Sequence, residues 1–250
     1  MIAIIGGGIC GLGIGWRLAQ AGENVTVYDR GAAGTEATWA AAGMLAPQVE
    51  AEHGEEFLLP LALESRALWK GFASELLSIT GIDVDYREEG TMVVGLDRDD
   101  SEYLENRFSY FQSLGLDVHW LTGYQARKRE PHLARAVGSA IYSALDHQVD
   151  NRLVAEALKT AFIGAGGILK ENIEIIGVVT AGGEVSAIET EEETILTDMV
   201  ILAAGAWSRN LPGLPDHSRP LVRPLKGQMI AVQMELKHPL IENVIWGPGN

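Results

Sequence analysis

Four glycines stand within the first eleven residues, and three of them have the spacing Gly6-x-Gly8-x-x-Gly11. Inside an ordinary helix or strand each glycine costs about 0.5–1 kcal/mol relative to alanine, so this cluster must serve another purpose. In this spacing the first glycine permits a tight turn, the second lets the backbone approach a pyrophosphate, and the third lets a helix lie close to a strand. The start of that helix presents free N–H groups and about half a positive charge. The pattern predicts a site for the diphosphate of a dinucleotide.

A carboxylate follows at the position where a dinucleotide site needs one. Asp29 ends the apolar run 25–28 and lies about 20 residues beyond the glycines, where a carboxylate accepts hydrogen bonds from a ribose hydroxyl. The alternative, a glycine-rich turn that only packs, predicts no such acid. The sequence alone does not separate NAD from FAD.

The elements around these residues have the order that such a site requires. Residues 2–5 form an apolar run, which predicts a strand buried on both faces of a parallel sheet. Apolar residues at helical spacing follow from Leu12 to Ala19, and Gly22 marks the end of that helix. Strand, glycine turn, helix and second strand thus fit into about thirty residues, as in a Rossmann-like unit.

Other groups that could do chemistry have simpler interpretations. Cys10 stands at a helix start, where a thiol can become reactive, but a small residue beneath a cofactor is favoured. His53 lies among four carboxylates in 50–56, without the regular spacing of metal ligands, so we expect a solvated acidic loop and no metal site. For His147, between Asp146 and Asp150, a helix-capping corner is favoured over acid–base work. No catalytic residue is assigned.

Composition excludes several classes of protein. The 250 residues are 47% hydrophobic and carry a formal charge of −15, which repels nucleic acid and anionic lipid. One cysteine allows no intrachain disulfide, and no apolar run approaches 18 residues. We expect a cytoplasmic globular protein without a membrane span or a nucleic-acid partner; a homo-oligomer is possible.

Three further stretches carry a family resemblance. Residues 38–45 read T-x-A-A-A-G-M-L, residues 197–208 read TDMVILAAGAWS, and residues 223–232 read RPLKGQMIAV, which we expect to be a strand. Together with the N-terminal turn they resemble, in order along the whole chain, the FAD-dependent amine oxidases of the D-amino acid oxidase superfamily, and within it the glycine oxidase group of the thiamin pathway. Trp39 departs from the small hydroxyl residue usual at its position.

The resemblance implies FAD as cofactor and names its contacts. It places Ala42, Gly43 and Met44 beside the flavin ring, and it places Ile175, in a strand after the helix of the 150s, at the adenine. The full set of implied cofactor residues is Gly6, Gly8, Ile9, Cys10, Gly11, Asp29, Arg30, Ala37, Thr38, Ala42, Gly43, Met44, Ile175, Ala204, Gly205 and Trp207.

The resemblance also implies the reaction. A small amino acid such as glycine, sarcosine or a D-amino acid would lose hydride from its carbon to the flavin, and O2 would be reduced to H2O2. A dehydrogenase that uses another electron acceptor, or a flavoprotein fragment or subunit without turnover, remains an alternative. The arginine that binds the substrate carboxylate in this family is expected beyond residue 250, so we expect an incomplete chain that retains flavin poorly and turns nothing over.

The predicted fold class is α/β. A Rossmann-like, glutathione-reductase-like FAD-binding domain would comprise 1–85 and 146–215. It would be interleaved with an α+β substrate domain on a mixed or antiparallel sheet, comprising 86–145 and 216–250. Helical spacing over 58–77 and aspartates before 101–114 predict two long helices, and two-residue alternation over 173–196 predicts a β-meander.

Overall fold

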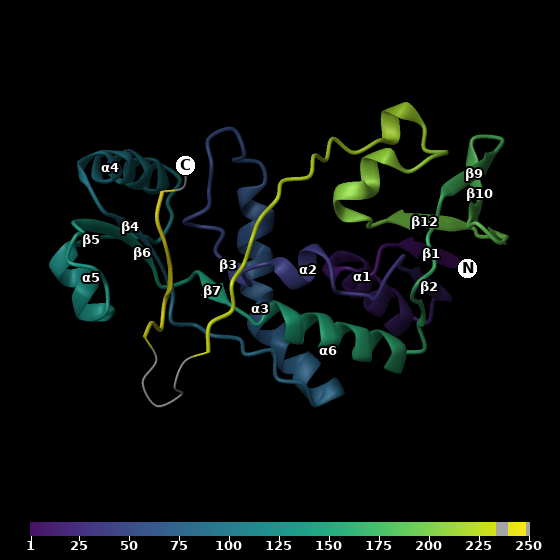
Figure 1. The fold of residues 1–250 in the computed structure, drawn as a ribbon, viewed down its shortest axis with the longest axis horizontal. Coiled ribbons are helices and arrows are strands. Elements are labelled where there is room, and N and C mark those ends of the chain that lie inside the picture. The colour runs from purple at the N-terminus through teal and green to yellow at the C-terminus, as the bar shows by residue number, and fades with distance from the viewer. Residues whose placement is uncertain (234–239, 249–250) are drawn as a thin grey trace. The chain divides into compact units, whose positions relative to one another are not determined.

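A computed structural model describes residues 1–233 and 240–248, which form two compact units. Unit 1 comprises Met1–Ala42, Glu75–Val84 and Asn151–Met229, and unit 2 comprises Gly43–Ser74, Asp85–Asp150 and Ile230–Asn250. Helix α3 (Leu59–Thr80) contributes to both units. Figure 1 draws the chain as a ribbon and labels most of its helices and strands.

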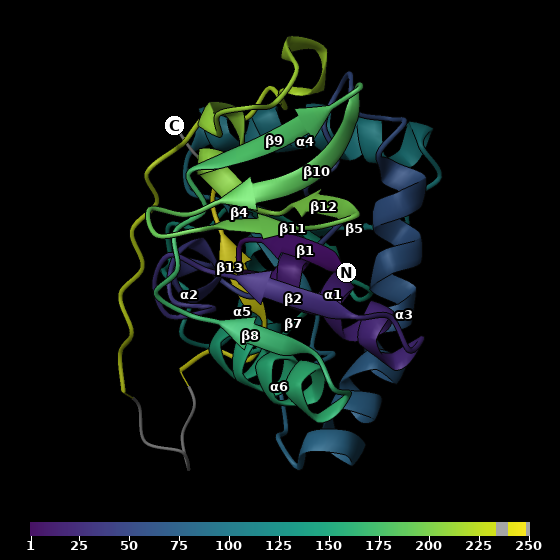
Figure 2. The ribbon, with the colours of Figure 1, turned by 90° about the vertical axis from the view of Figure 1, so that its right-hand side faces the viewer.

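A parallel sheet with the strand order β12-β1-β2-β8 forms the centre of unit 1 (Figure 2). The apolar runs of the sequence become its strands because side chains on both faces of such a sheet are buried. The N-terminal strand pairs with β12 at Ile2↔Met199 and with β2 at Ile2↔Val25. The strands are β1 (Ile2–Ile5), β2 (Val25–Tyr28), β8 (Ile168–Lys170) and β12 (Met199–Leu202).

Helices cover one face of this sheet. Helices α1 (Ile9–Gln20) and α6 (Asn151–Gly164) pack on each other. Gly15 of α1 makes this possible, because a Cβ built there would lie 3.1 Å from the ring of Phe162 and 3.2 Å from Val27. The predicted Rossmann-like order of strand, turn, helix and strand is confirmed.

An antiparallel meander covers the other face of the sheet. It consists of β9 (Gly177–Ala181), β10 (Glu184–Glu189) and β11 (Thr194–Leu196), as the two-residue alternation predicts. Its Val178 and Ile188 share a buried core with Ala3, Ile5 and Tyr28 of the sheet. Unit 1 also contains three short helices: α2 (Ala37–Ala40), η1 (Gly205–Asn210) and η2 (Asp216–Ser218).

Unit 2 contains a mixed sheet with the order β13-β4-β6-β5. Only the β13–β4 pair is parallel, and the other two pairs are antiparallel. The strands are β4 (Thr91–Gly95), β5 (His119–Thr122), β6 (Ser139–Ser143) and β13 (Val244–Trp246). A small antiparallel pair, β3 (Met44–Leu45) with β7 (His147–Gln148), also belongs to this unit.

Two helices accompany the mixed sheet, and side chains define where each begins. Helix α4 (Arg98–Ser113) starts three residues before the predicted position because Asp97 accepts a hydrogen bond from the N–H of Asp100. Helix α5 (Gly123–Arg129) begins with a capping box between Thr122 and Gln125. The mixed α/β class is therefore confirmed.

The structure corrects two predicted strands. Residues 223–232 are extended and exposed but form no strand, since no described strand supplies a partner for their backbone. Ile175 lies in the connection between β8 and β9 and not in a strand.

The compact units have other bounds than the predicted domains. Ala46, Val49 and Ala51, predicted within the FAD-binding domain, share a core with Val93 and Leu104 of unit 2. Of the predicted segment 216–250, residues 234–239 and 249–250 lie outside the described residues. The assignment of the two domains to cofactor and substrate stays a prediction.

Candidate functional site

The glycine turn between β1 and α1 has no room for side chains. Gly6 has a φ of +107°, a conformation that favours glycine, and a Cβ there would lie 2.3 Å from the carbonyl oxygen of Ala203. A Cβ on Gly11 would lie 1.9 Å from the carbonyl oxygen of Gly6. These contacts are the close approach of helix to strand that the spacing predicts.

The start of α1 is open to a ligand. The first N–H groups of a helix have no acceptor within it. Gly8, the residue before α1, offers no side-chain cap, and the hydroxyl of Thr38 accepts a hydrogen bond from the N–H of Ile9 at 3.0 Å. The neighbouring N–H groups, those of Cys10 and Gly11, have the position and polarity to bind a phosphate.

Asp29 holds the turn as well as facing the cavity. One of its oxygens accepts a hydrogen bond from the N–H of Gly7 at 2.8 Å, and the other accepts one from Gly31 at 2.9 Å. Each carboxylate oxygen can accept a further bond, so a ribose hydroxyl can still be bound. Asp29 therefore fixes the turn before any ligand arrives.

A cavity of about 560 Å³ opens over this turn within unit 1, inside the range of about 300–1,000 Å³ common for small-molecule sites. Residues from the turn, from the end of β2 and from η1 line it. The guanidinium of Arg30 lies 3.8 Å above the ring of Trp207 and pairs with Glu36 at 3.1 Å. A cation stacked on an aromatic face is worth about 0.5–2 kcal/mol, so these three side chains hold two walls of the cavity together.

Most of the residues predicted to bind a cofactor lie around this one cavity. The structure places Ala42 in unit 1 outside its lining, and Gly43 and Met44 in unit 2. Gly11 packs on Gly6 behind it. The predicted residues that line the cavity are Gly6, Gly8, Ile9, Cys10, Asp29, Arg30, Ala37, Thr38, Ile175, Ala204, Gly205 and Trp207.

Sequence reasoning missed other parts of the lining. Glu36 lines the cavity with a carboxylate that pairs with Arg30, and no motif in the sequence indicated it. The remaining missed residues lie beside predicted ones: Ile5, Tyr28, Gly34, Thr35, Ile173, Glu174, Ile176, Ala203, Ala206, Asn210, Leu211 and Pro212. No pattern marks the 210–212 stretch, which begins at the last residue of the 3-10 helix η1 and continues into a loop.

A buried polar cluster occupies unit 2 around β7. Asp146 is completely buried and accepts hydrogen bonds from the N–H groups of Gln48 and Val49. Burial raises the pKa of Asp146 to about 6 despite these bonds. His147 lies in β7, not at a helix cap, and its ring Nδ1 is 2.5 Å from the hydroxyl of Tyr86. Burial lowers the pKa of His147.

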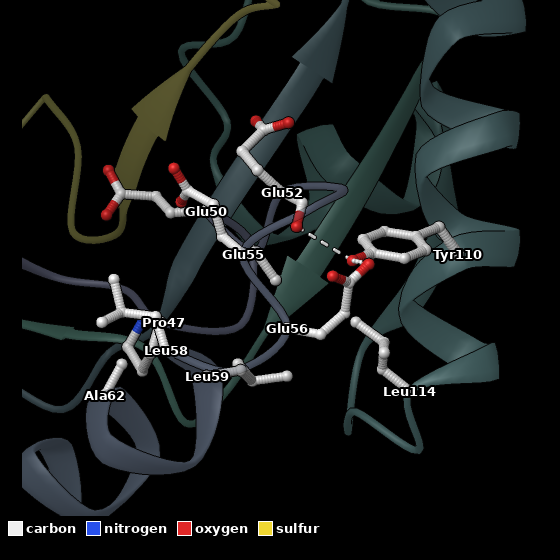
Figure 3. A pocket seen from close by; sticks show the side chains of 11 residues that line it. Pro47, Glu50, Glu52, Glu55, Glu56, Leu58, Leu59, Ala62, Tyr110 and Leu114 are labelled. Atoms are coloured by element: carbon white, nitrogen blue, oxygen red, sulfur yellow. Dashed lines mark hydrogen bonds between the residues drawn. The ribbon is translucent and has the colours of Figure 1, made fainter.

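The acidic segment 50–56 lines a smaller cavity of unit 2, about 130 Å³ in volume (Figure 3). The hydroxyl of Tyr110 contacts the carbonyl of Glu52 and the carboxylate of Glu56, each at 2.9 Å. Bonds from backbone N–H groups and from Tyr110 lower the pKa of Glu56. Among the described residues no group of three or more His, Cys, Asp or Glu could hold a metal ion. The segment is an acidic loop fastened to α4.

Comparison with known proteins identifies the family. Residues 1–248 match the family described as DAO, FAD dependent oxidoreductase. The chain belongs to this family. The chain is also similar to the glycine oxidase of Geobacillus kaustophilus, with 34% identity over 247 residues, 98% of this chain and 64% of that protein. A glycine oxidase of Pseudomonas putida is 30% identical over 92% of this chain and 61% of its own length.

Solved structures agree with this FAD-dependent oxidoreductase assignment. The crystal structure of the Geobacillus kaustophilus glycine oxidase superimposes with a TM-score of 0.79 at 35% identity, over 84% of this chain and 56% of that one.

A further relative by sequence, a bifunctional ThiO/ThiG protein of Trichormus variabilis, is 32% identical over 93% of this chain and 34% of its own length. This chain therefore spans less than two thirds of the length of these relatives.

The cavity fits the cofactor of the FAD-dependent oxidoreductase family. The turn at Gly8 leaves space for a diphosphate, with only the hydroxyl of Thr38 near a Cβ built there, at 3.2 Å. Asp29 offers a ribose acceptor, and apolar residues such as Ile175 and Leu211 line the wall near an aromatic ring, Trp207.

In the part of the chain that the structure describes, no helix is long and apolar enough to span a membrane.

Proposed function

We propose that this chain binds FAD in the cavity of unit 1 and belongs to an oxidase that acts on the amine of a small amino acid. The observation that carries the proposal is the cavity itself. One wall has the glycine turn and the open start of α1, and the other has Trp207 under Arg30. Similarity to glycine oxidases over nearly the whole chain supports the reaction class.

In this proposal the residues of this chain bind FAD and orient it. N–H groups at the start of α1 would hold the diphosphate, and Asp29 would accept from the adenosine ribose. When bound, FAD supplies the acceptor for the hydride that the substrate carbon loses. The overall reaction converts the amino acid, water and O2 into a 2-oxo acid, an amine and H2O2. The amine released is ammonia from glycine or D-alanine and methylamine from sarcosine.

Glycine is a substrate candidate because two relatives are named glycine oxidases. The family resemblance adds sarcosine and D-alanine. The similarity to ThiO/ThiG proteins supports a place in thiamine biosynthesis. In this proposal Ala42, Gly43 and Met44 lie beside the flavin ring. Residues 1–85 with 146–215 form the FAD-binding domain, and 86–145 with 216–250 contribute to the substrate domain.

A cofactor titration tests the first half of the proposal. FAD is added to the purified chain, and the quenching of flavin fluorescence and the heat of binding are recorded. We expect saturable binding that Asp29→Ala weakens by about tenfold or more, because the variant loses both the ribose acceptor and the support of Gly7 and Gly31. Asp117→Ala, which removes an exposed carboxylate of unit 2, is the control. Absence of binding would refute the proposal.

An amine titration tests the second half. In the product of the whole gene, loaded with FAD and kept anaerobic, glycine, sarcosine or D-alanine should bleach the flavin absorbance. Oxygen should then restore the absorbance and yield one H2O2 per amine consumed. Bleaching without peroxide formation would favour a dehydrogenase with another electron acceptor. A yellow protein that none of these amines bleaches would refute the amine oxidase.

A further inference from the structure

We propose that Asp146 is a positioning residue for the segment 43–50, which it holds through the backbone N–H groups of Gln48 and Val49. This inference rests on the proposed function, because the family resemblance, and not a distance, assigns Gly43 and Met44 of this segment to the flavin ring. The hold itself is a feature of unit 2 alone.

The contacts converge on one carboxylate. The Oδ1 of Asp146 accepts from the N–H of Gln48 at 3.2 Å, and its Oδ2 accepts from the N–H of Val49 at 2.9 Å. Asp146 is in turn fixed by the turn before β7, where its carbonyl accepts a bond from the hydroxyl of Thr91 at 3.2 Å. A carboxylate with two N–H donors in a buried site makes strong, directional contacts.

The side chain of Gln48 extends the same hold. Its amide donates to the hydroxyl of Ser143 at 2.9 Å, and its carbonyl accepts from the N–H of Asp117 at 2.8 Å. Gln48 is 2% exposed, and Ser143 and Asp146 are fully buried. Both polar atoms of the Gln48 side chain are thus paired within unit 2.

The strand that follows Asp146 also pairs with the residues predicted to lie beside the flavin. Met44 and Leu45 pair with Gln148 and His147 as β3 and β7, and the N–H of Val149 donates to the carbonyl of Gly43 at 2.9 Å. Asp146 stands at the start of that pairing strand. One residue therefore sets both the end of segment 43–50 and the strand against which its beginning pairs.

The hold depends on the charge of Asp146. A protonated carboxyl group has one oxygen that donates, so one of the two N–H groups loses its acceptor. The groups that face Asp146 are Arg66 of α3, which favours the carboxylate, and Glu50, which opposes it. Next to it His147 faces Tyr86 and Glu88. Because burial raises the pKa of Asp146 to about 6, the segment should loosen as the pH falls below 6.

The test compares the native chain with Asp146→Asn. The variant keeps the shape of the side chain but has one acceptor oxygen and an NH2 group that only donates. Asp117→Asn is the matched control, because its exposed carboxylate takes no part in the hold while its backbone N–H still donates to Gln48. Two readouts are recorded on each protein: hydrogen exchange of the 44–51 amides, and the visible spectrum of added FAD between about pH 5 and pH 8.

We expect the amide of Gln48 or Val49 to exchange about tenfold faster or more in Asp146→Asn, and at the native rate in Asp117→Asn. The native protein should approach the exchange rates of Asp146→Asn below about pH 6, and its bound-flavin spectrum should shift over the same range. In Asp146→Asn that spectrum should be independent of pH.

Unchanged exchange in Asp146→Asn would overturn the inference. Faster exchange with a bound-flavin spectrum that still titrates as in the native protein would overturn the flavin role of Asp146. If none of the three proteins binds FAD, the proposed function fails and the flavin role falls with it. The exchange data then still decide whether Asp146 holds the segment.

Discussion

The contact between α1 and the glycine turn allows a quantitative prediction with a control in the same helix. A Cβ at Gly11 would lie 1.9 Å from the carbonyl oxygen of Gly6, a backbone atom that no rotamer change can move. An ordinary carbon–oxygen contact needs about 3.2 Å or more, so α1 would have to shift by roughly 1 Å or more. At Gly13, two residues further along the helix, a Cβ meets nothing within 4 Å.

The two alanine substitutions should therefore have opposite effects on stability. Gly11→Ala should lower the free energy of unfolding by about 3 kcal/mol, since overpacking against a rigid backbone costs about 1–3 kcal/mol or more. Gly13→Ala should raise it by about 0.5–1 kcal/mol, because alanine is the better helix former. At about 2–4 °C per kcal/mol for a chain of this size, Tm should fall by roughly 6–12 °C in the first variant and rise by roughly 1–4 °C in the second.

Circular dichroism during heating measures both shifts, and a fluorescence titration measures FAD binding. Gly11→Ala should also weaken FAD binding, because the shift of α1 displaces the N–H groups of Cys10 and Gly11 that would bind the diphosphate. Gly13→Ala should bind FAD as the native chain does. A Gly11→Ala protein with native Tm and native affinity would refute the close approach of helix and strand, and with it the assigned role of the third glycine.

Three further predictions concern other parts of the chain. Relative to Asp146→Asn, the native protein should lose about 2–3 kcal/mol of unfolding free energy as pH rises from about 4 to about 7. Burying the charged carboxylate costs more than its two N–H bonds return, which raises the pKa of Asp146 from 3.8 to about 6, so protonation stabilises the fold as a whole even though it frees one N–H of the segment. Urea unfolding at several pH values measures the difference, which a pH-independent gap would contradict. The exposed thiol of Cys10, the chain's single cysteine, should react with Ellman's reagent about tenfold more slowly in saturating FAD, because Cys10 lines the cavity; an unchanged rate with FAD bound would place the cofactor elsewhere. Glu75→Gln should cost only about 0.2–1 kcal/mol, and less in high salt, because its two-pronged pair with Arg17 is exposed to solvent; a loss above 2 kcal/mol would show that the pair carries more of the fold than its exposure indicates.

The nucleotide turn could be predicted from the sequence because its physics is local. Gly6 has a positive φ, and a Cβ on Gly6 or on Gly11 would meet a backbone carbonyl oxygen within 2.3 Å, so these two positions require glycine. Asp29 could be predicted for the same reason, because it directly follows the strand β2, which ends beside the turn. The strands and helices near them have clear periodicity.

Other features depend on residues far apart along the chain. The side chains of Ala46 and Val49 pack against β4 and α4, a contact that no local pattern in the sequence reveals. Nothing in the local pattern reveals that Asp146 binds Gln48 and Val49, about 100 residues earlier. The strand expected at 223–232 from the family resemblance is absent, because no described strand lies beside this segment to pair with its backbone.

The pairing of the first strand with β12 has a consequence for synthesis. Ile2 is matched to Met199, so the central sheet of unit 1 cannot close until about 200 residues have left the ribosome. At about 5–20 residues per second this takes roughly 10–40 s, and during this time β1 can pair with β2 but not with β12. Because such long-range parallel pairing is slow to form, we expect chaperone binding to the nascent chain in this interval, and a circular permutant that joins β12 to β1 should shorten it.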